Sequence, residues 1–388
     1  MAGSVHRGAG GGDLPFTDPA GRPTLRTVAE LAGVHVSTAS RVLNQVSGPG
    51  VRSASRTTSE RIRRIAQRVG YSPNPHATGL RTSRSNLVGV LVPRLVDIVL
   101  ATIYEGIEEA TATYGFSTFV ANTGDDPVAQ RQRTEMVLAR RVDGMIFGDA
   151  YIDGGFLDEI AGRGVPFVLV SRRAGAHPSV TCDDVLGGRL AAEHLLGLGH
   201  RRLAVIAGEP YASTGIDRTA GFRAACAEAG VEVPEARVVH SGFDTEGGRA
   251  AMVEILAGGD VPDAVFAVND FAAVGAMGVL RDAGLAVGRD IGVVGFNDVP
   301  LAGSLPVGLT TVRSPMHEMG VRAAHLLMRR LRGEQVESER LVPSLVPRAS
   351  TLGVEVGWSG ARGVGPGSGA GAPGSTPDRP APRTPTPR

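Results

Sequence analysis

The sequence predicts a small all-helical domain followed by a larger α/β domain with parallel sheets. Residues 24–44 place apolar side chains at helical spacing on both sides of a glycine, whereas from Leu87 onwards short apolar runs alternate with amphipathic stretches of helical length. The net charge differs between the same two parts of the chain. Between Pro23 and Asn86 there are ten arginines and two glutamates, a balance of 10 − 2 = +8, so the rest of the +1 chain carries 1 − 8 = −7. A basic small domain on an acidic larger one is typical of proteins that bind nucleic acid.

The first residues and the overall composition predict a protein of the cytoplasm. Residues 1–22 are rich in glycine without a periodic apolar pattern, so we expect a disordered arm that lacks the apolar segment of a secretory signal. None of the apolar runs among the 388 residues has the length needed to span a membrane. The two cysteines, Cys182 and Cys226, are too few for a framework of disulfides.

Residues 24–44, TLRTVAELAGVHVSTASRVLN, predict two short helices joined at Gly33, a residue that tolerates positive φ. Two helices that meet at a glycine in this way have helix-turn-helix geometry. Thr24 is placed to cap the first helix, but Thr27 stands where a capping box has Glu or Gln, so we expect this cap to be only half formed. The apolar residues expected to pack between the helices are Leu25, Val28, Ala29, Ala32, Ala39, Val42 and Leu43.

The outward face of the second helix carries short side chains and one arginine, which suits the major groove of DNA. Arg41 can donate two hydrogen bonds to guanine or contact a phosphate. The alternative is an amphipathic helical hairpin with no role on DNA, and the basic charge of the domain argues against it. The residues expected to face DNA from this helix are Val36, Ser37, Thr38, Ser40, Arg41 and Asn44.

A segment rich in glycine, proline and serine, Gln45–Ser55, precedes a third helix. The segment contains Arg52, so it either reaches along the DNA backbone or forms an inert surface insertion. Thr57 and Glu60 have capping-box spacing, which predicts a helix over 57–69 whose apolar stripe closes the small core.

After this helix the pattern changes to a linker and then to alternating strands and helices. Prolines 73 and 75 end the helix, which gives a helix-turn-helix domain over 23–72 and a hinge over 73–86. The alternation over 87–353 requires parallel sheets covered by helices on both faces, with too many units for one sheet. Residues 354–388 should be a disordered tail. The expected strands are Leu87–Val92, Ser117–Ala121, Gly144–Phe147, Pro166–Val170, Leu203–Ala207, Ala264–Val268 and Ile291–Gly295, and the expected helices are Ile98–Tyr114, Ala129–Arg140, Val185–Leu198, Asp217–Ala229, Thr245–Leu256, Phe271–Ala283 and Pro315–Leu331.

The helix-turn-helix stretch, the proline-asparagine segment after it and the α/β module together resemble the LacI/GalR family of bacterial transcription regulators, over about residues 23–353. The resemblance implies a helix-turn-helix head and a two-lobed effector-binding and dimerisation domain, like the type I periplasmic sugar-binding proteins. It implies a homodimer, or a tetramer, that binds a palindromic operator in double-stranded DNA and represses carbohydrate-related genes in response to a small-molecule effector. The alternatives are a regulator that has lost its ligand and a sugar-binding protein of a transport system.

The resemblance also extends the set of DNA contacts. In the family the hinge becomes helical on the operator and a leucine enters the minor groove, and the match places this leucine at Leu80 with a supporting alanine at Ala77. His35 stands where the family usually has a serine that touches phosphate, so it either binds phosphate itself or fills the turn. The further DNA-binding residues implied are Thr24, Arg26, His35, Asn74, Ala77, Leu80 and Arg81.

The loop after the first strand, residues 94–100, departs from the family. Most relatives carry an asparagine, a proline and two aromatic residues there, whereas this chain has Asp97 followed by aliphatic residues. Aromatic stacking on a ligand is lost, and a carboxylate that accepts hydrogen bonds from hydroxyls or an amine is gained.

The remaining effector contacts are implied at the carboxyl ends of strands, where ligands bind in open α/β sheets. Amides and carboxylates there suit a sugar or a nucleoside. Ser171 and Asn297 replace acids of well-known relatives, Asp270 is placed to be only a helix cap, and Arg218 is either a ligand contact or an ion-pair partner. The implied effector-binding residues are Asp97, Ser171, Arg189, Phe243, Asn269, Asp270 and Asn297.

The sequence gives no comparable support for catalysis. It holds no nucleophile elbow, no Cys/His metal spacing and no P-loop, and Gly154-Gly155 and Gly187-Gly188 are isolated pairs. We therefore expect a protein that is not an enzyme and has no cofactor and no metal.

Overall fold

The computed structural model describes residues 17, 21–43, 54–71 and 84–353. Most of the expected arm, most of the Gln45–Ser55 segment and the tail over 354–388 lie outside the described residues. Only residues 84–86 of the expected hinge are described.

The head consists of three helices, α1 (Leu25–Leu31), α2 (Val36–Leu43) and α3 (Arg56–Val69). Gly33 adopts a φ of 59° in the turn between α1 and α2, as the helix-turn-helix prediction requires. The buried apolar residues of all three helices form one small core, and they are Val28, Ala29, Ala32, Ala39, Val42, Ile62, Ile65 and Ala66.

Two helix starts differ from the prediction. The Thr24 hydroxyl accepts from the backbone N–H of Thr27 at 3.3 Å, and the Thr27 hydroxyl accepts from the backbone N–H of Thr24 at 3.0 Å. The capping box of α1 is therefore complete, because a threonine hydroxyl at the third helical position reaches the same N–H that Glu or Gln would. Helix α3 is capped by Ser55, whose hydroxyl accepts from Thr58 at 3.2 Å, so the box predicted at Thr57 and Glu60 was wrong.

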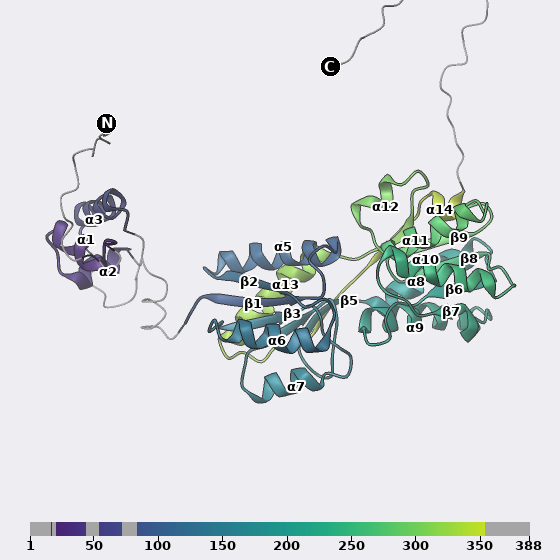
Figure 1. Cartoon of the computed structure of the whole chain (residues 1–388), viewed down its shortest axis with the longest axis horizontal. Helices are drawn as coiled ribbons and strands as arrows, with labels where there is room; N and C mark the ends of the chain where they lie inside the picture. Colours follow the sequence, from purple (N-terminus) through teal and green to yellow (C-terminus); the bar gives the residue numbers. More distant parts are fainter. Residues whose placement is uncertain (1–16, 18–20, 44–53, 72–83, 354–388) are drawn as a thin grey trace, which may run out of the picture. The chain divides into compact units, whose positions relative to one another are not determined.

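The first lobe has a fully parallel sheet with helices on both faces. Its strands are β1 (Leu87–Val92), β2 (Ser117–Asn122), β3 (Gly144–Phe147), β4 (Phe167–Val170), β5 (Ser179–Cys182) and β11 (Glu339–Leu341), in the order β11-β5-β4-β3-β1-β2. One face is covered by α5 (Ile98–Thr113) and α13 (Met316–Leu331), and the other by α6 (Pro127–Leu138) and α7 (Gly155–Gly162) (Figure 1).

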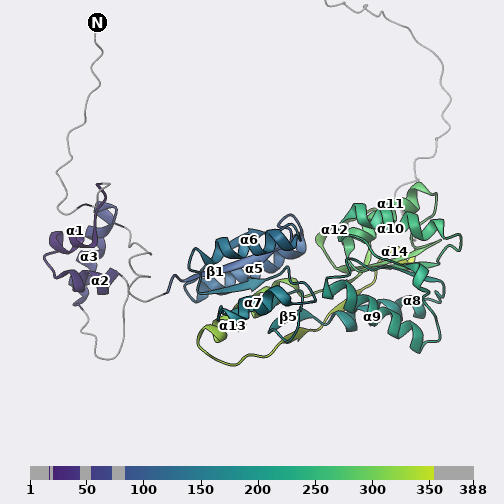
Figure 2. The ribbon, with the colours of Figure 1, turned by 60° about the horizontal axis from the view of Figure 1, so that its bottom comes forward.

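The second lobe repeats this plan with one antiparallel edge strand. Its strands are β6 (Leu203–Ile206), β7 (Val238–Val239), β8 (Ala264–Ala267), β9 (Gly292–Asn297), β10 (Thr310–Arg313) and β12 (Ser344–Val346), in the order β12-β10-β9-β8-β6-β7. Helices α8 (Asp184–Gly197) and α9 (Ser213–Glu228) lie on one face, and α10 (Thr245–Ala257) and α11 (Asp270–Asp282) on the other (Figure 2). Three short helices complete the lobe, namely η1 (Glu235–Arg237), α12 (Pro300–Ser304) and α14 (Ala349–Leu352).

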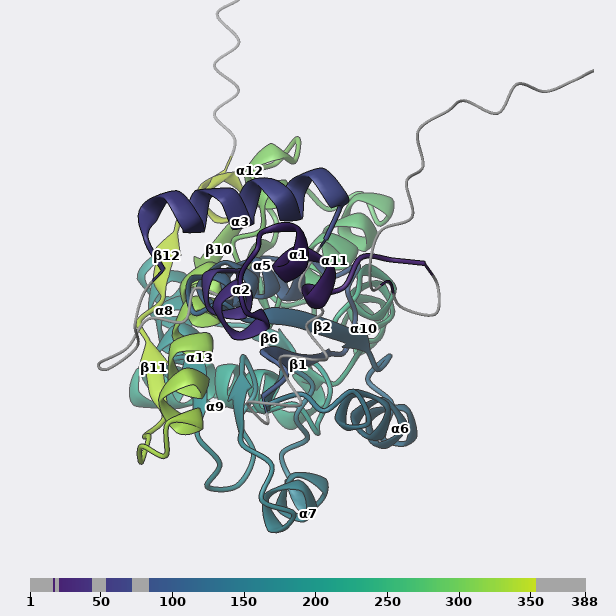
Figure 3. The same ribbon diagram turned by 90° about the vertical axis from the view of Figure 1, so that its left-hand side faces the viewer.

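The chain passes between the lobes at three places. It leaves the first lobe between β5 and α8, returns between β10 and α13, and crosses again between β11 and β12. Figure 3 shows β11 and β12 on the same side of this domain. Each lobe is therefore built from separate segments of sequence, and the carboxyl ends of the parallel strands meet between the lobes.

The predicted two-lobed α/β fold is confirmed, with the seven expected strands ending within two residues of the observed ones. The sequence reading missed the five strands β5, β7, β10, β11 and β12. These strands are two to four residues long, and most lie at or near a sheet edge. Such short, partly polar runs carry too little apolar periodicity to be distinguished from loops.

Candidate functional site

The head presents the expected DNA-facing residues along α2. His35, Val36 and Ser37 are exposed, and Thr38, Ser40 and Arg41 are half-buried. Among its contacts, the Arg41 guanidinium donates to the Ser37 carbonyl at 3.1 Å, so the side chain lies along its own helix. Thr24 lies at the start of α1 and Arg26 is exposed on it, whereas Asn44, Asn74, Ala77, Leu80 and Arg81 lie outside the described residues.

His35 caps the start of α2. Its Nδ1 accepts from the backbone N–H of Ser37 at 3.2 Å and lies 2.8 Å from the Ser37 hydroxyl. Because a backbone N–H only donates, Nδ1 is unprotonated in this arrangement and Nε2 carries the proton. The exposed imidazole can thus fill the turn and also offer an N–H donor at the N-terminus of the helix, where a phosphate is favoured.

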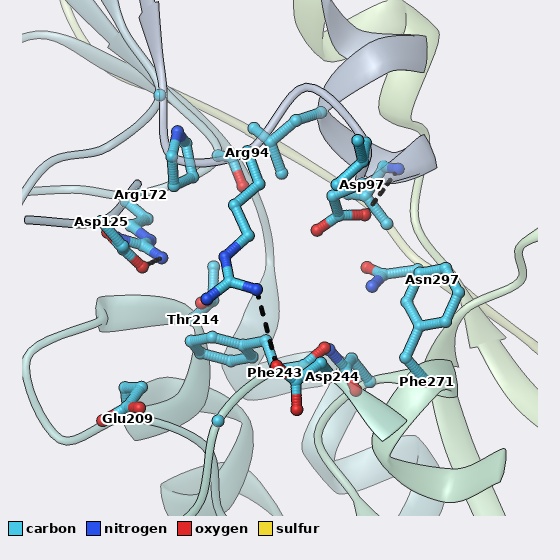
Figure 4. Close-up of a pocket in the computed structure, with 18 of the residues that line it drawn as sticks. Arg94, Asp97, Asp125, Arg172, Glu209, Thr214, Phe243, Asp244, Phe271 and Asn297 are labelled. Atoms are coloured by element: carbon cyan, nitrogen blue, oxygen red, sulfur yellow. Dashed lines mark hydrogen bonds and ion pairs between the residues drawn. The ribbon is translucent and has the colours of Figure 1, made fainter. Parts of the chain in front are cut away.

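In the two-lobed domain a pocket of about 440 Å³ lies between the lobes. Its lining residues come from loops that follow strands of both sheets and from the starts of the helices after them (Figure 4). The first lobe contributes Arg94, Asp97, Asp125, Ser171 and Arg172, and the second contributes Glu209, Tyr211, Thr214, Arg218, Phe243, Asp244, Asn269, Phe271 and Asn297, among others. This placement follows the general rule for ligands of open α/β sheets.

Five of the seven predicted effector residues line this pocket, and Arg189 and Asp270 do not. The two terminal nitrogens of Arg189, on α8, each lie 2.6 Å from a carboxylate oxygen of Glu228 on α9. The expectation that Arg189 points into the cleft is therefore not met, because this ion pair holds it against the neighbouring helix. Asp270 is buried behind the pocket, where it accepts from the Thr311 hydroxyl at 2.6 Å and from the Val299 N–H at 2.8 Å.

Asn269 positions another pocket residue. Its side-chain oxygen accepts from the backbone N–H of Ala272 at 2.8 Å and caps α11, and its amide nitrogen donates to the Phe243 carbonyl at 2.7 Å. These two bonds fix the Phe243 loop to the start of α11. The Phe243 ring then lies 5.8 Å from the Arg172 guanidinium carbon.

Asp97 and Asn297 retain hydrogen-bonding capacity. One Asp97 carboxylate oxygen accepts from the Val99 N–H at 2.9 Å and caps α5. Burial raises the pKa of this carboxyl above its usual range. The Asn297 side-chain oxygen is buried and has no hydrogen-bond partner among the described residues. A buried oxygen of this kind is stabilised when a ligand donates to it.

Each arginine of the pocket is paired with a carboxylate. Two bonds of 2.7 Å join Arg172 to Asp125, and both side chains are nearly buried. Arg218 contacts Asp184 at 2.7 Å and also donates to the Val268 carbonyl at 2.8 Å. Arg94, from the first lobe, lies 3.6 Å from Asp244 of the second lobe, and both side chains are about half exposed.

A second set of contacts joins the lobes beside the pocket. Arg173 of the first lobe pairs with Asp217 on α9 at 2.6 Å, and its backbone N–H donates to the Ser213 hydroxyl at 2.9 Å. Tyr151 of the first lobe stacks on Tyr211 of the second at 4.8 Å between ring centroids. We call these five residues the interlobe clasp. The clasp holds the walls of the pocket together without using the Arg94–Asp244 pair.

Comparison with known proteins matches both parts of the chain to known protein families. The family model described as bacterial regulatory proteins of the lacI family matches residues 24–74, and the periplasmic binding protein-like domain matches residues 192–351. The chain is 32% identical to the HTH-type transcriptional regulator DegA of Bacillus subtilis (strain 168), over 85% of this chain and 98% of DegA. It is 35% identical to the HTH-type transcriptional regulator CelR of Thermobifida fusca, over 83% of this chain and 95% of CelR. The chain belongs to the LacI family.

Solved structures of LacI-family regulators agree with the whole architecture. A CelR–cellobiose complex superposes with a TM-score of 0.65 at 34% identity, covering 85% of this chain and 100% of that one. The lac repressor dimer bound to operator and the anti-inducer ONPF superposes with a TM-score of 0.77 at 30% identity, covering 85% and 99%. This LacI-family chain is accordingly a transcription regulator of the helix-turn-helix type with an effector module.

The relatives of this LacI-family chain are named regulators and not enzymes. In the described part of the chain, no three His, Cys, Asp or Glu residues gather closely enough to hold a metal ion. None of the described helices has the length and apolarity to cross a membrane.

Sequence reasoning missed several pocket residues of the regulator, chiefly Asp125, Arg172, Glu209 and Tyr211. A signal for three of them was present. Arg172 follows β4, Asp125 follows β2 and Glu209 follows β6 within three residues, which is the position that the strand-end rule selects. Tyr211 lies further along the loop after β6, where the sequence alone does not indicate which residues turn toward the other lobe.

Proposed function

We propose that this regulator is a repressor of carbohydrate-related genes that binds a near-palindromic operator as a homodimer. In this proposal a sugar or nucleoside binds in the pocket between the lobes and changes the affinity for DNA. The observation that supports it most is the pocket itself, whose walls come from both lobes of a chain that also carries a helix-turn-helix head. A ligand that contacts both lobes stabilises one arrangement of them over others.

On the DNA side, α2 is the proposed reading helix. Val36, Ser37 and Arg41 would contact base edges, and His35 at its start would donate to a phosphate. Leu80 of the hinge would enter the minor groove with Ala77 in support, as the family resemblance implies. A homodimer supplies two such heads, which matches two operator half-sites related by a two-fold axis. This function requires a protein located in the cytoplasm.

On the effector side, Asp97, Ser171, Phe243, Asn269 and Asn297 are the proposed contacts. The aromatic ring and the amides match the two surfaces of a sugar, its apolar face and its hydroxyls.

The test is to measure operator affinity and thermal stability of the full chain with a panel of sugars and nucleosides. A binding effector raises the melting temperature by mass action and changes operator affinity. A panel without a melting shift, combined with an operator affinity indifferent to all its members, would favour a regulator that has lost its ligand. Absence of specific operator binding under every condition would contradict the regulator itself.

A further inference from the structure

The charges that line the pocket indicate the chemistry of the effector, given the proposed function above. Three arginines and four carboxylates line the pocket. Each of these arginines already forms an ion pair, with Asp244, Asp125 or Asp184. An anionic ligand would have to compete with these carboxylates for the guanidinium groups, and the Arg172 and Arg218 pairs are buried. When one partner of a buried ion pair is removed, the other is left as an uncompensated buried charge, which strongly destabilises the protein.

The pocket therefore offers a ligand hydrogen-bond acceptors that form no ion pair, whereas its arginines are already paired with carboxylates. Asp97 and Glu209 form no ion pair with an arginine among the described residues. Asp97 uses one carboxylate oxygen to cap α5, which leaves the other to accept from a ligand. Figure 4 shows Asp97 pointing into the pocket above Asn297.

Asn297 is an independent indication that a ligand binds in the part of the pocket beside Asp97. The residue is 5% exposed, lines the pocket and has a side-chain oxygen without a partner in the described part of the chain. The ring of Phe271 lies beside it (Figure 4). A carboxylate, an amide oxygen and an aromatic ring around one point form an environment that stabilises an ammonium group.

We propose that the effector is a hydroxylated molecule carrying a protonated amine, such as an amino sugar, whose ammonium group binds between Asp97 and Asn297. The amine donates to the second Asp97 oxygen and to the Asn297 oxygen, while its hydroxyls meet the amides at the strand ends. Burial of the Asp97 carboxyl, which already raises its pKa, strengthens the attraction because little water competes. The inference rests on the proposed effector response of the pocket.

The experiment compares matched ligands on the full chain by calorimetry and thermal shift. Each series consists of a neutral sugar, the amino sugar, its N-acetyl derivative and the sugar phosphate, built on glucose, galactose and ribose. We expect the amino sugar of at least one series to bind at least about tenfold more tightly than the other three members, since a charge-assisted hydrogen bond in a buried site is worth about that factor. Binding should weaken as the pH rises above the pKa of the amine.

Asp97→Asn is the decisive variant because asparagine also caps helices well, so α5 retains its cap while the charge is lost. It should abolish the preference for the amine. Asp126→Asn is the matched control, since Asp126 caps α6 in the same way at 2.7 Å and does not line the pocket. This control should keep the preference.

Three results would overturn the inference while leaving the proposed sugar response in place. These are equal binding of the neutral and amino members, tighter binding of the phosphate, and an Asp97→Asn variant that still prefers the amine. A lack of binding by every member, with operator affinity unchanged, would contradict the inference and the proposed effector response together.

Discussion

At the scale of single residues, several polar side chains of the regulator serve both the fold and a binding surface. His35 caps α2 and leaves a ring N–H exposed, and Asp97 caps α5 with only one of its two oxygens. The capping role of such residues can be predicted from the local sequence, because capping positions are recognisable. Their binding role cannot, because it depends on the groups that face them across the pocket or the DNA groove. Arg41 likewise lies along its own helix and must extend to read a base.

Arg41→Ala should reduce the discrimination between operator and unrelated DNA by about 1–3 kcal/mol, because one bidentate contact to a base is lost. The head should stay folded, since its core of apolar residues is untouched. Footprinting and binding titrations at fixed salt measure the effect. Arg56→Ala is the control, because this exposed arginine of α3 pairs with Glu60 on its own helix at 3.1 Å. An unchanged protected sequence and affinity in the Arg41 variant would show that Arg41 does not read the operator.

Asp149 predicts a pH dependence of stability. Burial raises its pKa from 3.8 to about 6, and its carboxylate oxygens have no hydrogen-bond partner among the described residues. The folded protein therefore binds this proton more tightly than the unfolded chain does, and the contribution to stability is lost as the pH rises from about 4 through about 6. Asp149→Asn should increase the free energy of unfolding at pH 8 by up to about 3 kcal/mol, and the melting temperature should rise accordingly.

The same substitution should have little effect at pH 4, where the carboxyl is protonated in the folded protein. Melting curves at the two pH values test this difference. The exposed Asp126→Asn variant provides the reference, and a gain for Asp149→Asn that is equal at both pH values would contradict the electrostatic explanation.

At the scale of elements, three helix pairs of the two-lobed domain cross at glycines. A Cβ atom on any of these glycines would lie about 2 Å from a backbone carbonyl oxygen of the partner helix. The helices therefore approach more closely than any other residue would permit. The pairs are α5 with α13 at Gly106 and Gly320, α8 with α9 at Gly188 and Gly221, and α10 with α11 at Gly248 and Gly275.

Gly188→Ala should destabilise the domain by about 1–3 kcal/mol, because the new methyl group would lie 2.0 Å from the Arg218 carbonyl oxygen and must force α8 and α9 apart. Gly197→Ala, on the same helix, meets nothing within 4 Å and should instead stabilise by up to about 1 kcal/mol. Denaturant unfolding of the two variants gives the comparison. Equal effects of the two alanines would show that helix propensity, and not the close approach, decides the cost.

These elements also show how far sequence reasoning reaches. Long buried strands such as β1 and amphipathic helices such as α5 repeat an apolar period and are predictable within two residues of their ends. The edge strands β11 and β12 are not predictable in this way, because their pairing depends on how the same chain crosses from one lobe to the other. In the pocket, Asn297 was anticipated because it comes at the end of a strand, and Asp97 because the family resemblance places it in the loop after the first strand. The Arg172–Asp125 pair was missed because its two members are 47 residues apart in sequence.

At the scale of the whole regulator, coupling between effector and operator requires lobes that occupy more than one arrangement. The three chain crossings permit a change of angle between the lobes, and the interlobe clasp opposes their separation. Effector binding and operator binding are then linked through one equilibrium, so each changes the affinity of the other by the same factor.

Arg173→Ala should therefore weaken effector binding by about threefold to tenfold, because it reduces the fraction of molecules whose lobes are held together around the pocket. No contact to the effector is removed, since neither Arg173 nor Asp217 lines the pocket. Arg223→Ala breaks an ion pair of 2.8 Å with Glu235 inside the second lobe and serves as the control. Calorimetric titration of each variant, with and without operator DNA, measures both affinities. If Arg173→Ala binds effector like the Arg223 variant and shows the same linkage to the operator, the clasp is a static contact and the lobes do not transmit the signal by closing.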